Sequence, residues 1–436
     1  MSNVKPIYLF AIMAVVIVFI GQVQSWQLAL AIVNLCLISS IMALGVNIQW
    51  GYAGLFNVGI MGFAALGGMA AIVVSMSPIG EAWEAGASGV GIAGIVVAIT
   101  AFAAFYLRKI MTAGRQRSFV VLATVAVGYF VARSFFDPAT DRIEDINPAL
   151  SGYLGGLGLP IVFAWAVGGL FAAAAAWVVG KITLGLRSDY LAIATLGISE
   201  IIIAVLKNED WLTRGVKNVT GIPRPVPYEV DLQETPWFLE LASSVGMTPI
   251  VASSVYVKLC YAGLFLIVLM LIFWLCERAL NSPWGRMMRA IRDNETSAEA
   301  MGKDVTGRHL HIFVLGSAVV GIAGAMLTTL DGQFTPTTYN PLRYTFLIWV
   351  MVIIGGSGNN WGSVFGGFLI WVVWVEAEPV GLLLMDLLTS GMAEGAALRV
   401  HLLESAPHMR MVLMGVILLS ALRFAPRGLI PERTRS

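Results

Sequence analysis

The sequence predicts an all-α polytopic membrane protein, on the evidence of its composition and its long apolar segments. Of the 436 residues, 58% are hydrophobic and 12% are charged, whereas soluble domains contain about 25% charged residues. Many apolar segments approach or exceed the roughly 20 residues that cross a bilayer as a helix. A soluble protein cannot cover its surface with so few charges, so we expect one transmembrane domain over residues 1–436.

Twelve apolar segments are candidate membrane spans. The tenth is short and residues 49–57 fit a re-entrant piece, so we expect ten to twelve crossings. The first segment lacks the A-x-A-like site of a cleaved signal peptide and is interpreted as an uncleaved span. The candidate spans lie near residues 6–24, 27–48, 58–76, 89–107, 118–136, 161–180, 188–206, 255–276, 311–330, 343–356, 362–380 and 409–424.

Charged residues are divided unequally between two sets of loops. One set contains 17 of the 27 Lys and Arg residues, and the other contains six of them but 16 of the 26 acidic residues. Because basic residues in short loops mark the cytoplasmic side, both termini are predicted to be cytoplasmic, which requires an even number of crossings. The basic set is 1–5, 108–117, 181–187, 277–311 and 423–436, and the acidic, periplasmic set is 76–88, 137–160, 207–254, 331–342 and 381–408.

The sequence contains no pattern typical of an enzyme, a metal site or a nucleotide site. Cys36, Cys260 and Cys276 fall in spans without paired spacing, and the four histidines form no H-E-x-x-H pattern. The sequence also lacks the G-x-x-x-x-G-K-[ST] motif of a P-loop. We therefore expect no catalytic residue, no metal, no cofactor and no nucleic-acid partner.

Two glycine-rich segments recur in the two halves of the chain. Residues 51–68 (GYAGLFNVGIMGFAALGG) and 355–370 (GGSGNNWGSVFGGFLI) each contain six glycines. Glycine-interrupted segments in corresponding halves indicate the pathway of a transporter, because broken helices are tolerated only inside protein or near water. Close helix packing is the alternative. We favour broken helices, with the pathway residues Asn47, Gly54, Asn57 and Gly59.

The seventh candidate span adds three polar residues to the predicted pathway. Glu200 lies in the middle of the span, and an intramembrane carboxylate is a functional candidate because its burial is costly. The alternative is a structural acid that pairs with a neighbouring helix or is held protonated. Thr195 and Ser199 lie four residues apart on one helix face. They line a polar path or bond back to the preceding turn.

The loop at 277–311 predicts two short helices. Pro283 suits the start of the first, and apolar residues at i, i+3, i+4 and i+7 make it amphipathic. The second, TSAEAMG, ends at Gly302. An interface with anionic lipid suits the first helix, whereas docking onto a partner protein suits the second. The apolar positions are Trp284, Met287, Met288 and Ile291, and the arginines are Arg286, Arg289 and Arg292.

The sequence resembles the permease subunits of branched-chain amino acid ABC importers, specifically the larger, LivM-type permease. Six ordered blocks between about residues 40 and 430 show the resemblance. They are ALGVNIQWGYAGLFNVGIMGF at 43–63, SDYLAIATLGISEII at 188–202, TGIPRP at 220–225, SPWGRMMRAIRDNETSAEAMGKDV at 282–305, MVIIGGSGNNWGSVFGG at 351–367 and LRFAPRGLI at 422–430.

The resemblance implies an ABC importer permease fold in the bacterial inner membrane. Such a permease moves branched-chain amino acids (Leu, Ile, Val) into the cytoplasm, with ATP hydrolysed elsewhere. The implied partners are a second permease, two cytoplasmic ATP-binding subunits and a periplasmic amino-acid-binding protein, besides lipid. Glu299, Ala300 and Gly302 match the E-A-x-x-x-G-like coupling-helix signature with tighter spacing. Arg289 and Arg292 are assigned to the same ATPase-coupling surface.

Several alternatives remain open on this evidence. Many members of the family it resembles have a serine at the position of Asn57 and a histidine at that of Ile60, and this departure leaves the exact substrate open. Urea, short-chain amides or other amino acids are alternative substrates, because relatives that carry them share the motifs. An ion-driven secondary transporter would need a proton or sodium relay, but Glu200 is the one clearly central carboxylate. A non-transporting scaffold would not explain the paired glycine-rich segments.

Overall fold

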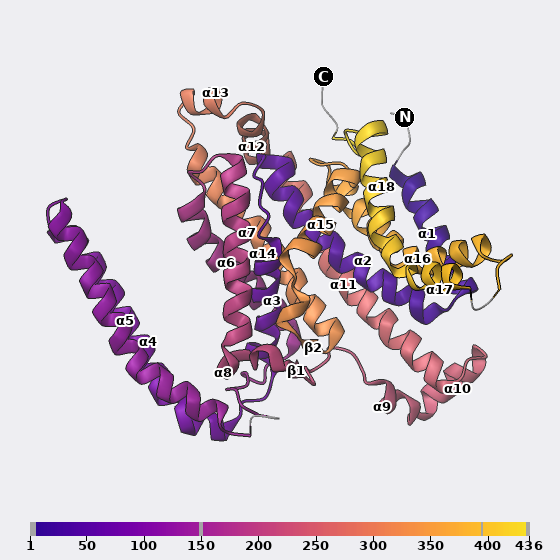
Figure 1. The fold of residues 1–436 in the computed structure, drawn as a ribbon, viewed down its shortest axis with the longest axis horizontal. Helices are drawn as coiled ribbons and strands as arrows, with labels where there is room; N and C mark the ends of the chain where they lie inside the picture. The colour runs from indigo at the N-terminus through magenta and orange to yellow at the C-terminus, as the bar shows by residue number, and fades with distance from the viewer. Residues whose placement is uncertain (1–5, 148–150, 394–395, 433–436) are drawn as a thin grey trace.

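The computed structural model describes residues 6–147, 151–393 and 396–432, which are almost entirely helical (Figure 1). The longer helices are α1 (Pro6–Val23), α2 (Trp26–Val46), α3 (Ile60–Ser75), α4 (Gly80–Ile110), α5 (Arg115–Glu144), α6 (Ile161–Thr183), α7 (Ser188–Asn208), α11 (Pro249–Asn281), α14 (Val305–Asp331), α15 (Pro341–Gly355), α16 (Asn360–Leu388) and α18 (Met409–Phe424). The shorter ones are the π-helix η1 (Asn47–Gly51), α8 (Asp210–Thr213), η2 (Gly215–Lys217), α9 (Glu229–Gln233), α10 (Pro236–Ser244), α12 (Pro283–Asp293), α13 (Glu295–Ala300), η3 (Pro336–Thr338), α17 (Ala397–Glu404) and η4 (Ala406–His408). Strands β1 (Val219–Thr220) and β2 (Gln333–Phe334) pair antiparallel, with Val219 opposite Phe334.

Ten helical segments of the described residues are long and apolar enough to cross a membrane. Two shorter apolar helices, α3 and α15, coincide with two further candidate spans. Each of the twelve candidate spans therefore corresponds to a helix. The prediction of an all-α polytopic protein with ten to twelve crossings is confirmed.

Helix α14 packs closely against both α2 and α3 in the core of the molecule, because the contact surfaces are glycine-rich. A Cβ atom on Gly67 of α3 would overlap the carbonyl group of Gly321 of α14. A Cβ atom on Gly324 would likewise overlap the carbonyl group of Ala64. Small residues let helix backbones approach within a membrane. Close packing, the alternative reading of the glycines, thus accounts for Gly67.

Helices α4 and α5 form a hairpin that leans away from the rest of the chain (Figure 1). The two helices pack mainly against each other, with Gly89 against Ala139 and Gly128 against Thr100. Few of their residues are buried. Their apolar surface is therefore available to lipid or to another subunit.

The loops gather at the two ends of the helices in the groups that their charges predicted. Helices α12 and α13, the turn between α4 and α5, the start of α1 and the end of α18 lie towards one end (Figure 1). The α8, β1, α9 and α10 elements, which belong to the 207–254 loop, lie towards the other. Which end faces the cytoplasm stays a prediction.

Candidate functional site

Each of the two glycine-rich segments contains a stretch without helical structure, here called a break. After α2 the chain continues as η1, and residues 54–59 have no regular structure before α3 begins. Gly54 has a φ of +72°, in the left-handed region that favours glycine. Between α15 and α16, Gly356 and Gly358 have φ values of +122° and +81°. A non-helical break is thus present in both segments. The second is the turn between two packed helices, because Gly366 of α16 lies against the Met351 carbonyl of α15, and close packing accounts for this glycine.

The two breaks lie against each other, although about 300 residues of sequence separate them. The Asn47 side-chain carbonyl accepts a hydrogen bond from Gly358 N (2.8 Å), and its amide donates to Asn360 Oδ1 (3.1 Å). The Tyr52 hydroxyl donates to the same Asn360 oxygen. A Cβ atom on Gly51 would lie 2.5 Å from Gly358 N. The first break can therefore approach the second only because residue 51 is glycine.

Asn57 holds the irregular stretch of the first break in place. Its amide donates to Gln49 Oε1 (2.9 Å), and its side-chain oxygen accepts from Gly59 N (2.9 Å). Its backbone carbonyl accepts from Trp349 Nε1 (3.0 Å). Gln49 is anchored in turn to Ser317 Oγ of α14 (3.0 Å). Because Asn57 and Gln49 are buried, these bonds replace the backbone pairing that the broken helix lacks.

Two hydroxyl groups of α7 cap the start of α3. Thr195 Oγ1 accepts from Val58 N (3.0 Å), and Ser199 Oγ accepts from Gly62 N (2.8 Å). A Cβ atom on Gly59 would overlap the backbone carbonyl of Thr195. The predicted shared face of Thr195 and Ser199 is confirmed, and it packs against the break rather than facing open space.

Glu200 points away from the buried face that contains Ser199. It is exposed, as are Gly197 and Ala204 on the same side of α7. The described residues supply no hydrogen bond or ion pair to its carboxylate. Within this part of the chain, the alternative of a structural acid paired with a neighbouring helix is therefore not observed. The Glu200 carboxylate is directed to lipid, solvent or another subunit.

The first short helix of the 277–311 loop is α12. It starts at Pro283, as predicted, and the Ser282 hydroxyl caps it by accepting from Gly285 N (3.3 Å). Met288 and Ile291 are buried, so the amphipathic face packs into the protein. The apolar side of α12 is therefore used within the chain.

The second short helix, α13, presents its end to the outside. The Asn294 side chain caps its start by accepting from Ser297 N (2.9 Å). Gly302 ends it in the left-handed conformation, with φ +76° and hydrogen bonds from Gly302 N to Glu299 O and from Lys303 N to Ala298 O. The predicted terminal glycine is confirmed. Glu299, Ala300 and Gly302 are exposed, and their role in coupling stays a prediction.

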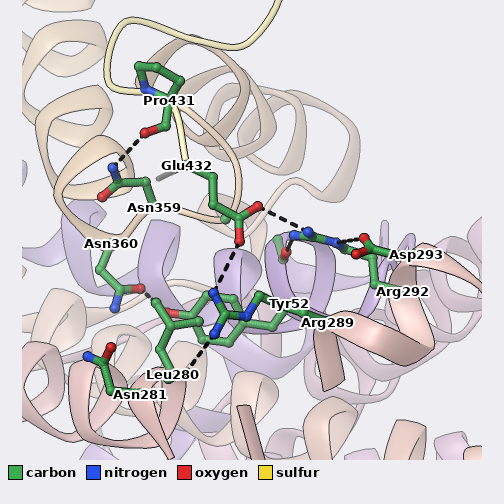
Figure 2. A network of polar contacts seen from close by, with 12 residues as sticks. Tyr52, Leu280, Asn281, Arg289, Arg292, Asp293, Asn359, Asn360, Pro431 and Glu432 are labelled. Carbon is green, nitrogen blue, oxygen red and sulfur yellow. Dashed lines mark hydrogen bonds and ion pairs between the residues drawn. The ribbon is translucent and has the colours of Figure 1, made fainter. Parts of the chain in front are cut away.

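Arg289 and Arg292 lie on the inner side of α12 and are used within the chain (Figure 2). Arg292 Nη2 pairs with Glu432 Oε2 (3.0 Å), and Arg289 Nη1 lies 3.7 Å from Glu432 Oε1. Arg292 Nη1 also donates to the Gly51 carbonyl, and Arg289 Nη2 to the Leu280 carbonyl (3.4 Å). Of the two predicted coupling arginines, Arg292 therefore contacts the first helix break, and Arg289 contacts Leu280 and Glu432.

Sequence reasoning missed several residues of this network. Glu432 is the sole acid between residues 423 and 436, among four arginines. This isolated acid in a basic segment could have indicated an ion-pair partner. Gln49 and Glu277 gave no such signal, since Gln49 adjoins a glycine-rich segment and Glu277 begins a basic loop. Glu277 Oε1 accepts from Asn360 Nδ2 (2.9 Å), which ties α11 to the second break.

The described residues include no cluster of three or more His, Cys, Asp or Glu side chains that could hold a metal ion. Over the same part of the chain, Cys36, Cys260 and Cys276 are free thiols. The site consists instead of two touching helix breaks, their polar braces and an adjoining loop with an exposed end.

Comparisons with known proteins show which family the sequence matches. The family model "Branched-chain amino acid transport system / permease component" matches residues 118–422, more than half of the chain. The chain is 26% identical over 248 residues to a probable branched-chain amino acid transport permease protein LivM of Methanocaldococcus jannaschii, covering 57% of this chain and 61% of the relative. It is 29% identical over 208 residues to the high-affinity branched-chain amino acid transport system permease protein LivM of Escherichia coli K12, covering 47% and 48%.

A further relative carries a different name. The chain is 28% identical over 104 residues to a probable branched-chain amino acid transport permease protein LivH of M. jannaschii, covering 24% of this chain and 32% of the relative. The chain thus spans about half to three fifths of the length of the LivM relatives. No solved structure matches it.

The family match covers the helices that build the second break, α7 and the 277–311 loop. Together with ten membrane-spanning candidates, the family match identifies a multi-pass transport permease of the inner membrane. Transport permeases are not an enzyme class. This chain belongs to the family of permease components of branched-chain amino acid transport systems.

Proposed function

We propose that this chain is the transmembrane permease subunit of an ATP-driven importer of branched-chain amino acids. It moves leucine, isoleucine and valine from the periplasm to the cytoplasm, while separate subunits hydrolyse ATP. The observation that carries the proposal is the contact between two helix breaks from opposite halves of the chain, through Asn47 and Gly358. Discontinuous helices of this kind commonly border the substrate pathway of transporters, because their free backbone groups must face protein or water.

The 277–311 loop supports coupling to external ATPases. Its second helix, α13, ends in an exposed left-handed glycine, and Glu299 and Ala300 are exposed beside it. The sequence has no P-loop of its own. A rigid push on such a helix is a known way to deliver a conformational change from one subunit to another. In this proposal the loop is cytoplasmic, as are both termini.

A second permease subunit is the expected membrane partner, and a periplasmic amino-acid-binding protein delivers the substrate. The chain is similar to proteins named LivM and to one named LivH, which supports a pair of related permeases. The outward face of α7 supports the same conclusion, because an intramembrane carboxylate such as Glu200 normally faces a protein interior or a water-filled path. In the proposal, that path lies beside α7 and between the subunits.

Reconstitution tests the proposal. The chain is co-purified with its second permease and its ATPase subunits, placed in proteoliposomes with the binding protein, and supplied with radiolabelled leucine. We expect uptake that requires ATP and is competed by isoleucine and valine. Uptake of urea or a short-chain amide, uncompeted by leucine, would instead assign the alternative substrates. Uptake driven by a proton or sodium gradient without ATP would reject the importer class.

A further inference from the structure

Arg292 connects the 277–311 loop to the first helix break. It lies in the last turn of α12, and its Nη1 donates to the carbonyl oxygen of Gly51, the last residue of η1. In a continuing α-helix, the N–H of Leu55 would bond to that carbonyl, but it bonds to Gln49 O instead (3.0 Å). A basic side chain commonly satisfies a carbonyl that a helix end leaves open. Arg292 therefore completes the hydrogen bonding of the break.

Arg292 also touches glycines of both breaks. A Cβ atom on Gly54 would lie 3.4 Å from Arg292 Cγ, and one on Gly358 would lie 3.2 Å from Arg292 Nη1. Arg292 therefore lies beside both glycines, and at Gly358 the Glu432 carboxylate lies nearer still, with Oε2 2.8 Å from the Cβ position. Gly51 and Gly358 are themselves in close contact. A displacement of the guanidinium group therefore changes the packing at both breaks.

Glu432 fixes the position of this arginine (Figure 2). Its carboxylate lies 3.0 Å from Arg292 Nη2 and 3.7 Å from Arg289 Nη1. The side chains of Arg292 and Glu432 are only 24% and 20% exposed, so solvent screens the pair less than it screens a surface pair. The guanidinium group thus has one partner on the break and another on the 428–432 segment, besides Asp293 Oδ1, which lies 3.2 Å from its Nε.

The 428–432 segment is bound to the second break. Leu429 N donates to Ile354 O (2.8 Å) and Ile430 N donates to Gly355 O (2.9 Å), at the end of α15. The Asn359 side chain donates to Pro431 O (3.0 Å). The segment that carries Glu432, the partner of Arg292, is therefore hydrogen-bonded to the second break.

We infer that Arg292, held by Glu432, is a positioning residue that transmits movement of the 277–311 loop to the two helix breaks. The inference rests on the proposed function. Helices α12 and α13 meet at Asn294 and pack against each other, so a push on α13 moves α12 and its arginine. Because the guanidinium group bonds Gly51 and Glu432 together, the two breaks move as one unit.

The test measures uptake and ATP hydrolysis in the same proteoliposomes, with the complete co-purified complex. The variants are Arg292→Gln, Glu432→Gln and their combination, and Glu432→Asp is the conservative variant. Arg286→Gln is the matched control, because Arg286 is exposed on α12 and bonds only to the Asn281 carbonyl (3.4 Å) among the described residues. Co-purification of the ATPases with every variant is recorded alongside.

We expect Arg292→Gln and Glu432→Gln each to lower the leucine transported per ATP hydrolysed by about fivefold or more, the lower range of typical coupling between sites. ATPase co-purification and ATP hydrolysis stay near the wild-type values. The double variant is no worse than the stronger single one, since both remove one link, and Glu432→Asp recovers part of the ratio. Arg286→Gln resembles the wild type.

Three outcomes separate the inference from the proposed function. An unchanged ratio of uptake to hydrolysis in both variants, with a working wild-type complex, overturns the inference alone. Loss of the ATPases from the variants also overturns it, because the residues would then act in assembly. Absence of ATP-dependent uptake in the wild type rejects the proposed function itself. If Arg292→Gln does not fold, Glu432→Gln tests the same link from its other end.

Discussion

Ser199 of α7 accepts a hydrogen bond from the backbone N–H of Gly62 in the first turn of α3, at 2.8 Å and across 137 positions of sequence. The first N–H groups of any helix lack intrahelical acceptors, and the N-cap of α3, Gly59, has no side chain to supply one. The α7 hydroxyl therefore caps α3 from a neighbouring helix. This bond ties the first helix break to α7.

Removal of that cap is expected to destabilise the protein. Ser199→Ala leaves Gly62 N without its acceptor, and loss of a helix cap costs about 0.5–2 kcal/mol. Ser188→Ala is the matched control, because Ser188 is exposed at the start of α7 and makes no hydrogen bond to another described residue. Thermal unfolding in detergent should show a lower Tm for Ser199→Ala than for Ser188→Ala. Equal Tm values would mean that water or lipid replaces the cap.

Gly59 is expected to tolerate no larger residue. In Gly59→Ala the new methyl group overlaps the backbone carbonyl of Thr195, so α3 and α7 must separate, and overpacking of this kind costs about 1–3 kcal/mol. Gly91→Ala, inside α4, meets nothing within 4 Å and should gain up to about 1 kcal/mol of helix propensity. Thermal unfolding and leucine uptake of the two variants are compared, and we expect both to be impaired in Gly59→Ala alone. A neutral Gly59→Ala would contradict the close contact of α3 and α7.

Much of the fold follows from the sequence because lipid imposes simple rules on it. Runs of apolar residues become helices in a membrane, so all twelve candidate spans coincide with helices. Glycines that adopt left-handed or other positive φ values lie in the breaks at residues 54–59 and 356–359, as Gly54, Gly356 and Gly358 do. The same composition does not separate breaking from packing, which is why Gly54 and Gly67 belong to one cluster but have different roles.

The side-chain contacts of the site were much less predictable. The spacing of residues along α12 placed Arg289 and Arg292 away from its apolar face, but it did not reveal that both turn towards Glu432. That pairing joins segments about 140 residues apart, and a single sequence gives no distance between them. Helix spacing correctly put Thr195 and Ser199 on one face, whereas their acceptor role depends on where α3 begins.

A charge at the end of α13 is expected to release the ATPase subunits. Gly302 is exposed, has a φ of +76° and has no atom near its Cβ position. Asn and Asp both tolerate this left-handed conformation, so Gly302→Asp and Gly302→Asn differ mainly in charge. We expect both variants to insert normally and only Gly302→Asp to lose ATPase co-purification and uptake. Retention of the ATPases by Gly302→Asp would reject the coupling role of α13.

The two ends of the molecule should label from opposite sides of the membrane. Val230 of α9 and Met301 beyond α13 are 64% and 79% exposed, so Val230→Cys and Met301→Cys offer accessible thiols. A membrane-impermeant maleimide should modify Val230→Cys in intact cells whose outer membrane has been permeabilised, and Met301→Cys only after the inner membrane is opened. The chain without an added cysteine measures the background labelling of Cys36, Cys260 and Cys276. The reverse pattern would invert the orientation drawn from the basic loops.

Glu200 provides the most direct test of where the transport path lies. Its carboxylate is exposed on the outward face of α7, and the described residues offer it no partner. Glu200→Gln should therefore change the free energy of unfolding of the isolated chain by no more than about 0.5 kcal/mol, as for an ordinary surface substitution. In the complete complex it should lower leucine uptake while co-purification of the other subunits is retained, because a carboxylate at this depth is kept for a path or a polar contact. Glu240→Gln, exposed on α10 outside the spans, is the control and should transport normally. Unchanged uptake by Glu200→Gln would place the path away from this face of α7, and loss of the second permease would place a subunit contact there instead.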